Sequence, residues 1–106
     1  MEPECKKITR VVLPAVRAAV AQSLKEKHHY SQVEIAKKLG IVQVAVSKYI
    51  NGRYSEEVEK VKRKIAEKGI GAGLVEEIVK GMDSGKIAES IEHICAEIAM
   101  NGFSLG

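Results

Sequence analysis

The stretch at residues 31–53, SQVEIAKKLGIVQVAVSKYINGR, constrains the fold of this chain more than any other part of the sequence. It opens with Ser31 and Glu34 in the pattern Ser-x-x-Glu. In this pattern the Ser side chain accepts a hydrogen bond from the backbone of the Glu, while the Glu side chain reaches back to the Ser amide. Apolar residues follow at helical spacing, and Gly40 stands where a residue in the left-handed conformation would end a helix. The pattern predicts a short helix over residues 31–39.

A second short helical run follows this turn directly. Val46 and Ile50 lie four residues apart and share one face of the run, and the dipeptide Asn51-Gly52 closes it. Two helices joined by so tight a turn must cross steeply. One face of the second helix therefore stays free to enter a groove.

The order of these residues resembles the helix-turn-helix of the lambda-repressor-like (Cro/cI, or xenobiotic-response-element) family. That family has Gln at the first helix position, Ala four residues later, Gly at the turn, a β-branched residue in the middle of the recognition helix and a terminal Asn-Gly. The matching residues here are Gln32, Ala36, Gly40, Val46, Asn51 and Gly52. The preceding segment, LPAVRAAVAQSLKEK, is similar to small archaeal regulators in which the motif follows a Leu-Pro-Ala-Ile/Val-Arg opening.

A β-strand is the competing interpretation of residues 41–50. Val42, Val44 and Val46 alternate with other residues, as in a half-buried strand, and β-branched residues lose side-chain freedom in helices. A lone strand would have no partner in a chain otherwise patterned as helices, so we expect a helix. Family members usually place Thr or Ser where Val42 stands. The recognition helix therefore lacks an obvious N-cap, a feature typically worth ~1 kcal/mol.

Length and charge limit the possible functions. At 106 residues the chain suffices for one hydrophobic core but is short for a catalytic domain of ordinary size. Residues 1–54 carry ten Lys and Arg against four Glu, a balance of +6, whereas residues 55–106 carry seven against ten acidic residues, a balance of −3. The half that contains the motif is the basic half, as binding to phosphates requires. A basic half of this size can also be an ordinary solvated surface.

Helices are also predicted on both sides of the motif. Residues 4–12 favour a short helix. Pro14 either kinks a continuous helix or occupies the first turn of a new one, and we expect a new helix over residues 14–27. After the motif, Ser55 precedes two Glu residues, which predicts a capped helix that ends near residues 68–69.

The last third of the chain is predicted to form a helical hairpin. The glycine-rich segment GIGAG, residues 69–73, favours a flexible break. Two helices should follow, over residues 74–81 and from residue 85 or 86 to residue 100. The chain then divides into a helix-turn-helix DNA-binding domain at residues 1–69 and the hairpin at residues 70–106.

The last helix carries an apolar seam with intervals of four, three and four residues, formed by Ile87, Ile91, Ile94 and Ile98. This seam can pack on the preceding helix of the same chain, or it can form a two-fold interface with a second copy. We expect the second arrangement, because a flexible linker would leave the apolar face of the hairpin poorly covered. The hairpin is thus the expected dimerisation element, with the N-terminal segment as the alternative interface.

A helix-turn-helix implies a definite geometry of DNA recognition. The second helix lies in the major groove with its N-terminal residues at the base edges, and the first helix crosses the backbone. The residues expected to face outward are Val42, Gln43, Val44, Ser47 and Lys48. Gln43 is the best candidate for base readout, because its amide can both donate to and accept from adenine. Val42 or Val44 can meet a thymine methyl.

The remaining candidate contacts are to phosphates. Gln32, at the start of the first helix, is placed for a phosphate together with the backbone amides there. Lys37, Lys48 and Arg53 are further candidates, and Lys38 is a weaker one. Each Lys can instead be an ordinary surface charge.

No cofactor or metal is expected. The archaeal regulators often have Cys-x-x-Cys near the C-terminus, which suggests metal or iron–sulfur binding in that group. In this chain Glu92 stands where the first Cys would fall and only Cys95 remains, and a lone thiol cannot hold a cluster. Cys5 lies ninety residues away from Cys95, too far for a disulfide framework or a finger-like metal site.

These features together predict an all-α, sequence-specific DNA-binding transcription regulator, a homodimer on pseudo-palindromic double-stranded DNA. The alternative is a protein-interaction adaptor of the coactivator type, in which the same bundle does not bind specific DNA. No nucleophile–base pair, carboxylate pair or metal cluster occurs at useful spacing, so we expect no enzyme. The sequence has no membrane-length apolar run and no signal-peptide pattern, which predicts a cytoplasmic protein, and it leaves a small-molecule effector open.

Overall fold

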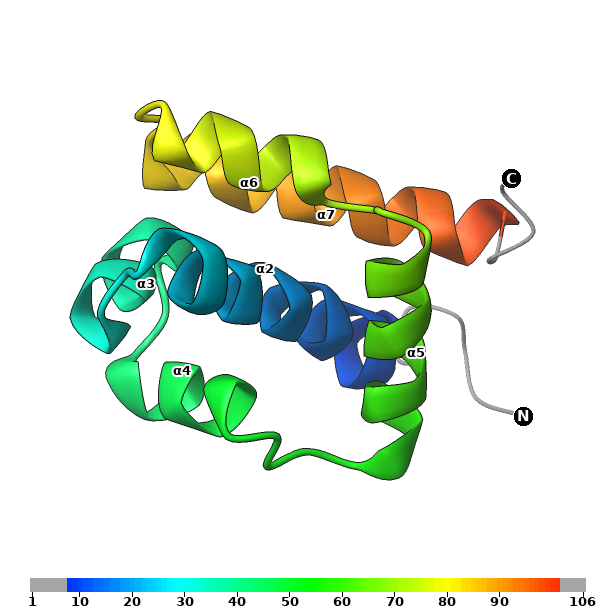
Figure 1. Ribbon diagram of the computed structural model, residues 1–106. Helices are drawn as coiled ribbons and strands as arrows, with labels where there is room; N and C mark the ends of the chain where they lie inside the picture. Colours follow the sequence, from blue (N-terminus) through cyan, green and yellow to red (C-terminus); the bar gives the residue numbers. More distant parts are fainter. Residues whose placement is uncertain (1–7, 102–106) are drawn as a thin grey trace.

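The protein is described here by a computed structural model of residues 8–101, all of whose regular elements are helices (Figure 1). In chain order they are η1 (Ile8–Val12, a π-helical turn), α2 (Leu13–His28), α3 (Gln32–Leu39), α4 (Gln43–Ile50), α5 (Glu56–Glu67), α6 (Ala72–Val79) and α7 (Ser84–Asn101). The predicted all-α, helix-turn-helix class is confirmed.

Helix α2 is the centre of the bundle. Figure 1 shows α6 and α7 on one side of α2 and α4 on the other, with α3 and α5 near its two ends. The buried residues of α2 are mostly Ala and Val, together with Leu24. Side chains this small let neighbouring helices approach the α2 backbone closely from several directions. Because α2 is packed on several sides, it has no wide polar face. Every other described element packs against α2.

The N-terminal helices join without the break that we expected at Pro14. Val12 has helical dihedral angles, φ −70° and ψ −45°, so η1 continues directly into α2. Pro14 still lies in the first turn of α2, as predicted. A proline has no N–H and its ring crowds the carbonyl four residues earlier, and a wider π-turn relieves that crowding. Of the helix predicted over residues 4–12, residues 4–7 lie outside the described part of the chain.

The segment at residues 69–73 is a turn that packs on the core. The backbone N–H of Ile70 donates to the carbonyl of Ile65 at 3.0 Å, and the Ile70 side chain packs against the core cluster. Gly71 has φ 89°, a conformation that side-chain-bearing residues rarely adopt. Helix α6 then begins at Ala72, two residues before the predicted start.

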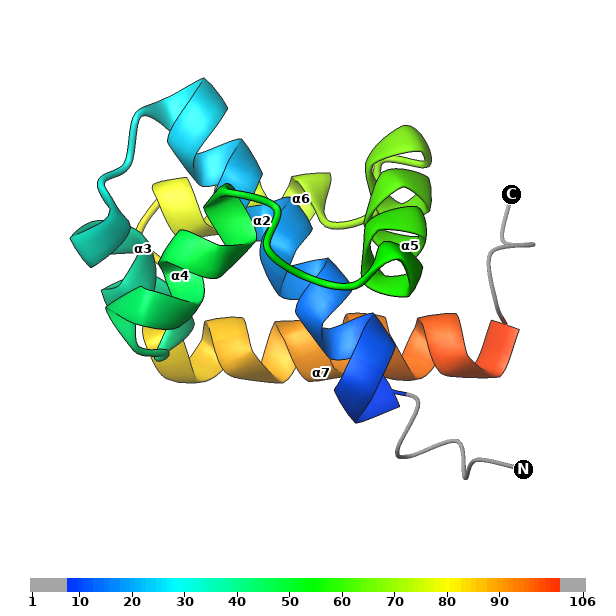
Figure 2. The ribbon, with the colours of Figure 1, turned by 90° about the horizontal axis from the view of Figure 1, so that it is seen from below.

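The apolar seam of α7 lies inside the core of the single chain. Ile87, Ile91 and Ile98 are buried, and Ile94 is partly buried against the same cluster. Figure 2 shows α7 running along the whole bundle, past α3, α2 and η1. The expectation that the hairpin leaves this face uncovered is therefore wrong. The described parts of the two predicted segments, residues 8–69 and 70–101, share one continuous cluster of buried residues.

Candidate nucleic-acid interface

The first helix of the motif, α3, begins at a capping box. The Ser31 Oγ accepts from the backbone N–H of Glu34 at 3.1 Å, and Glu34 Oε1 accepts from the backbone N–H of Ser31 at 2.8 Å. Both bonds were predicted from the Ser-x-x-Glu pattern. The bond from the Ser31 backbone is the main cause that lowers the pKa of Glu34, with the Ser31 hydroxyl contributing next.

The turn between the two helices has the predicted left-handed glycine. Gly40 has φ 66° and ψ 34°, and the N–H of Ile41 donates to the carbonyl of Ala36 at 3.1 Å. Ile41 packs against the core, which anchors the turn. Val42 is extended at φ −74° and ψ 151°, and no side chain caps the next helix, in agreement with the missing N-cap. The strand interpretation of residues 41–50 is excluded, because α4 occupies Gln43–Ile50.

Helix α4 has one buried and one exposed face. Val46 is 0 % exposed, whereas Val42 and Val44 are each 70 % exposed. Gln43 and Lys48 are also exposed. All but one of the residues predicted to face outward from the recognition helix therefore do so.

Ser47 is the exception, because it is half-buried near the end of α4. The Asn51 Nδ2 donates to the Ser47 carbonyl at 2.9 Å and to the Ser47 Oγ at 3.3 Å. The Ser47 carbonyl also accepts from the Asn51 backbone N–H at 3.0 Å, so the Asn51 side chain adds a second hydrogen bond to the last turn of α4. Gly52 follows with φ 69°, so the Asn-Gly pair closes the helix as predicted.

The candidate phosphate contacts differ in their surroundings. Lys37, Lys48 and Arg53 are exposed, and Gln32 is half-buried at the first position of α3. Lys38 is half-buried and its Nζ donates to the carbonyl of Met82 at 3.4 Å, in the turn between α6 and α7. Lys38 thus contacts the C-terminal hairpin, and it stays a weaker candidate for a phosphate contact.

A shallow open hollow between α3 and α4 was not foreseen from the sequence. Its lining is mainly apolar and consists of Val33, Ala36, Lys37, Gly40, Ile41, Val42, Gln43 and Ala45. Val33 is 48 % exposed at the second position of α3. Helical spacing alone places Val33 away from the buried Ile35, and its position beside α4 depends on the crossing of the two helices.

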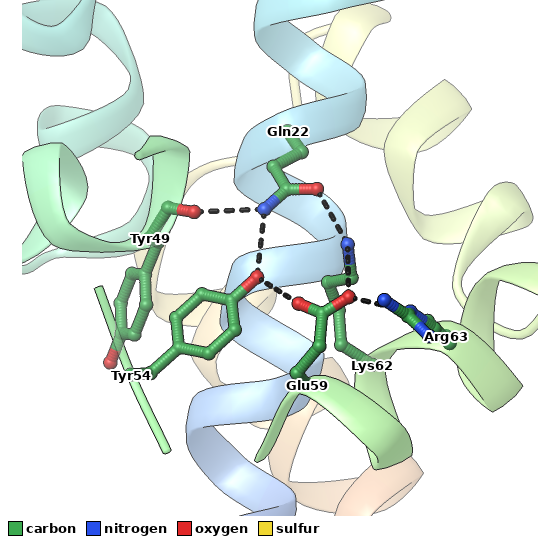
Figure 3. Close-up of polar contacts among 6 residues, drawn as sticks. All are labelled: Gln22, Tyr49, Tyr54, Glu59, Lys62 and Arg63. Atoms are coloured by element: carbon green, nitrogen blue, oxygen red, sulfur yellow. Dashed lines mark hydrogen bonds and ion pairs between the residues drawn. The ribbon is translucent and has the colours of Figure 1, made fainter. Parts of the chain in front are cut away.

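A polar cluster behind the motif was also missed, and Figure 3 shows its six residues. Gln22 of α2 donates through Nε2 to the Tyr49 carbonyl at 2.8 Å and to the Tyr54 hydroxyl at 3.1 Å. The Tyr54 hydroxyl donates to Glu59 Oε1 at 2.9 Å. Two cations of α5 complete the cluster, Lys62 and Arg63. These residues come from α2, the end of α4, the following loop and α5, so no local sequence pattern links them.

The cluster shifts two pKa values in opposite directions. Burial, and then the hydrogen bond to Glu59, raise the pKa of the Tyr54 hydroxyl. The hydrogen bond from Tyr54 is the main cause that lowers the pKa of the Glu59 carboxyl, and the hydrogen bond from Arg63 adds to it. Both shifts favour a neutral phenol that donates to an ionised carboxylate.

Within residues 8–101, no helix is long and apolar enough to cross a membrane. The same residues contain no group of three or more His, Cys, Asp or Glu side chains arranged to hold a metal ion. Cys95 is a free thiol buried against the core, and this burial raises its pKa to about 11. The nearby Arg17 lowers this value and Glu92 raises it, both less than burial does.

Comparison with known proteins adds one match. Residues 22–63, from the middle of α2 to the middle of α5, match the model of a protein family described as helix-turn-helix. No curated protein and no solved structure matches the chain significantly. The matched residues include both helices of the motif, the turn at Gly40 and the exposed face of α4. Residues 22–63 are therefore similar in sequence to a helix-turn-helix family, and the structure gives this segment the two helices and the tight turn of that motif.

Proposed function

We propose that the protein is a sequence-specific transcription regulator that reads the major groove of double-stranded DNA with α4. The observation that carries this proposal is that α4 has one buried face and one exposed face. Val46 lies on the buried face of the helix, while Val42, Gln43 and Val44 are exposed at its N-terminal end. The N-terminal residues of a recognition helix are those that reach base edges.

In this proposal base readout depends on one amide and two apolar side chains. Gln43 can form a paired donor and acceptor contact with the N6 and N7 atoms of adenine. Val42 and Val44 are both exposed, and in this proposal one of them contacts a thymine methyl. These contacts favour sites with A·T base pairs at the corresponding positions.

The proposed phosphate contacts lie in both helices of the motif and just after α4. Lys37, Lys48 and Arg53 are exposed cations on or next to the two helices of the motif. Gln32 stands at the start of α3, where the first backbone N–H groups have no helical partner and attract anions. The Ser47 hydroxyl accepts from Asn51, so its own proton remains for DNA.

The proposal includes a homodimer on a pseudo-palindromic site. Half-sites would then lie ~34 Å apart or a multiple of that distance. The face of α7 that carries Ile87, Ile91 and Ile98 lies in the core of one chain, so the proposed dimer uses another surface.

The test is a selection from a random-sequence DNA pool with the purified protein, at two salt concentrations, together with a sizing experiment. Enrichment of an inverted repeat that is bound by a dimer is the expected result. The affinity for the enriched site should fall steeply as the salt concentration rises, because phosphate contacts release counterions.

A pool without enrichment, combined with weak binding that disappears at moderate salt, would contradict specific recognition. In that case the same bundle would serve as a protein-interaction adaptor. Enrichment of a single half-site bound by a monomer would support specific recognition and overturn the dimer.

A further inference from the structure

We propose that Gln22 is a positioning residue of the recognition helix, because its side-chain amide ties the last turn of α4 to α2 and α5. This inference rests on the proposed function for its effect on DNA. Gln22 itself lies in α2 and is only part-buried, on a different element from the base-reading end of α4. Its effect on recognition therefore acts through α4.

Both the nitrogen and the oxygen of the Gln22 side-chain amide form hydrogen bonds. Nε2 donates to the Tyr49 carbonyl at 2.8 Å and to the Tyr54 hydroxyl at 3.1 Å. Oε1 accepts from Lys62 Nζ at 3.1 Å. Exchanging the nitrogen and the oxygen would place oxygen against a carbonyl and nitrogen against an ammonium, so only one orientation of the amide is favourable.

Two of the partners of Gln22, Tyr54 and Lys62, are joined to each other through Glu59, which closes a ring (Figure 3). Tyr54 donates to Glu59 at 2.9 Å, and Glu59 lies 3.6 Å from Lys62 Nζ, which returns to Gln22. Arg63 also donates to Glu59, from the outer side, at 2.8 Å. The side chains of Lys62 and Glu59 are only 17 % and 29 % exposed, so water screens this ring less than a fully exposed ion pair.

Helix α4 packs on α2 and α3, but few of its own residues are fully buried to set its orientation. It has eight residues, no side-chain N-cap and one buried residue, Val46. Tyr49 and Ile50, in its last turn, are only partly buried against the core, so the hydrogen bond from Gln22 adds a directional constraint to this apolar packing. The Tyr49 carbonyl lies at the opposite end of α4 from Gln43, a span of ~9–12 Å. A hydrogen bond at Tyr49 restrains the C-terminal end of α4 and thereby the direction of the whole helix. The direction of the helix sets the position of its N-terminal end, which reads the bases in the proposed function.

The test compares the full chain with Gln22→Met, which keeps the length of the side chain but removes its hydrogen bonds. Amide hydrogen exchange, measured by NMR on the free protein, reports whether α4 is held. The amides to follow are those of Asn51 and Arg53, which donate to the carbonyls of Ser47 and Lys48 at 3.0 Å and 2.9 Å. We expect their exchange to become about tenfold faster, with little change at the Ile35 amide of α3.

The same variant is then tested on the selected DNA site and on random-sequence DNA. We expect the affinity for the selected site to fall about tenfold and the affinity for random DNA to change less than about twofold. A merely structural role would lower both affinities by the same factor. Tyr54→Phe opens the ring but leaves the bond from Gln22 to Tyr49, so its effects should have the same direction and a smaller size. It also provides the test if Gln22→Met does not fold.

Arg10→Met is the matched control. It removes another polar contact to α5, the 3.0 Å ion pair between Arg10 and Glu57, but on the side of η1. It should leave both the α4 amides and the DNA preference unchanged. Unchanged exchange at Asn51 and Arg53 in Gln22→Met, or equal losses on both DNAs, would overturn the inference. If the parent protein has no DNA preference, the proposed function fails, and hydrogen exchange still decides whether Gln22 holds α4.

Discussion

At the scale of single residues, α4 carries a proposed base contact at its N-terminal end, Gln43, and a proposed phosphate contact in its last turn, Lys48. Gln43→Ala should lose ~1–3 kcal/mol on the selected DNA site and relax the preference at one base pair. Lys48→Ala should weaken all sequences alike and reduce the dependence of affinity on salt by about one unit of slope, because it removes one phosphate contact. Binding titrations on selected and random DNA at several salt concentrations measure both effects. Equal losses on the two DNAs for Gln43→Ala would exclude its role in base readout.

Cys95 gives a second prediction at this scale. Its pKa is raised to about 11 by burial, so at neutral pH very little of the thiol is ionised, and the thiolate is the reactive form. In a Cys5→Ser background, a thiol reagent should label Cys95 slowly in the folded protein and rapidly after denaturation. The time course of labelling, with and without denaturant, is the measurement. Rapid labelling of the folded protein would contradict the burial of this thiol.

At the scale of elements, the uncapped start of α4 links stability to recognition. Val42→Ser supplies a side chain that can accept from the first free amides of α4, which should stabilise the protein by ~1 kcal/mol. The same change removes an apolar side chain from the proposed DNA face and should weaken binding to the selected site. Urea unfolding and DNA titration measure the two effects. Val44→Ser, at a residue with the same 70 % exposure but within the helix, should weaken DNA binding without the gain in stability.

The ring behind α4 predicts how stability depends on pH. The folded-state pKa of Glu59 is below its ordinary value of 4.5, so its contribution is present above about pH 4.5 and is lost as pH falls. The folded-state pKa of Tyr54 is above its ordinary value of 10.0, so its contribution is present below about pH 10 and is lost as pH rises through the folded pKa.

The measurement is the difference in urea midpoint between the parent protein and Tyr54→Phe, from about pH 3 to about pH 11. This difference should form a plateau between the two limits and shrink at both ends. Other titrating groups contribute equally to both proteins and cancel in the difference. A difference independent of pH would contradict the bond between Tyr54 and Glu59.

At the scale of the whole molecule, the seam of α7 decides whether the hairpin is part of the monomer core. Ile91→Ala removes a buried side chain and should lower the free energy of unfolding by ~2–5 kcal/mol. Met100→Ala, in the same helix at a residue that is 83 % exposed, should change it by less than ~0.5 kcal/mol. Thermal unfolding together with sizing measures both. If Ile91→Ala abolished a dimer and left the stability of the monomer unchanged, the seam would be a dimer interface and not part of the monomer core.

The features that were predicted correctly all depend on residues close in sequence. The capping box joins Ser31 to Glu34, the turn needs only the conformation of Gly40, and Asn51 closes α4 through a residue four positions earlier. Helical spacing also predicted that Val46 is buried and that Gln43 is exposed. Patterns over three or four residues are sufficient here, because the interacting groups meet as soon as the helix forms.

The features that were missed depend on contacts between elements far apart in the chain. Lys38 contacts a carbonyl 44 residues away, and Lys62 contacts Gln22 over 40 residues. Nothing near Gln22 in the sequence marks it as a partner of Tyr49. Such pairs form only when the packing of α2, α4 and α5 brings the side chains together.

The sequence by itself determined the helices, the turn and the face of α4 that stays exposed, because these follow from local hydrogen bonds and from the spacing of apolar residues. It also determined that α7 has an apolar seam. Only the tertiary structure decided where that seam goes, because an apolar face gains the same free energy from any apolar partner that covers it. The turn at residues 69–73 brings the hairpin back onto α2, and the seam is buried within one chain.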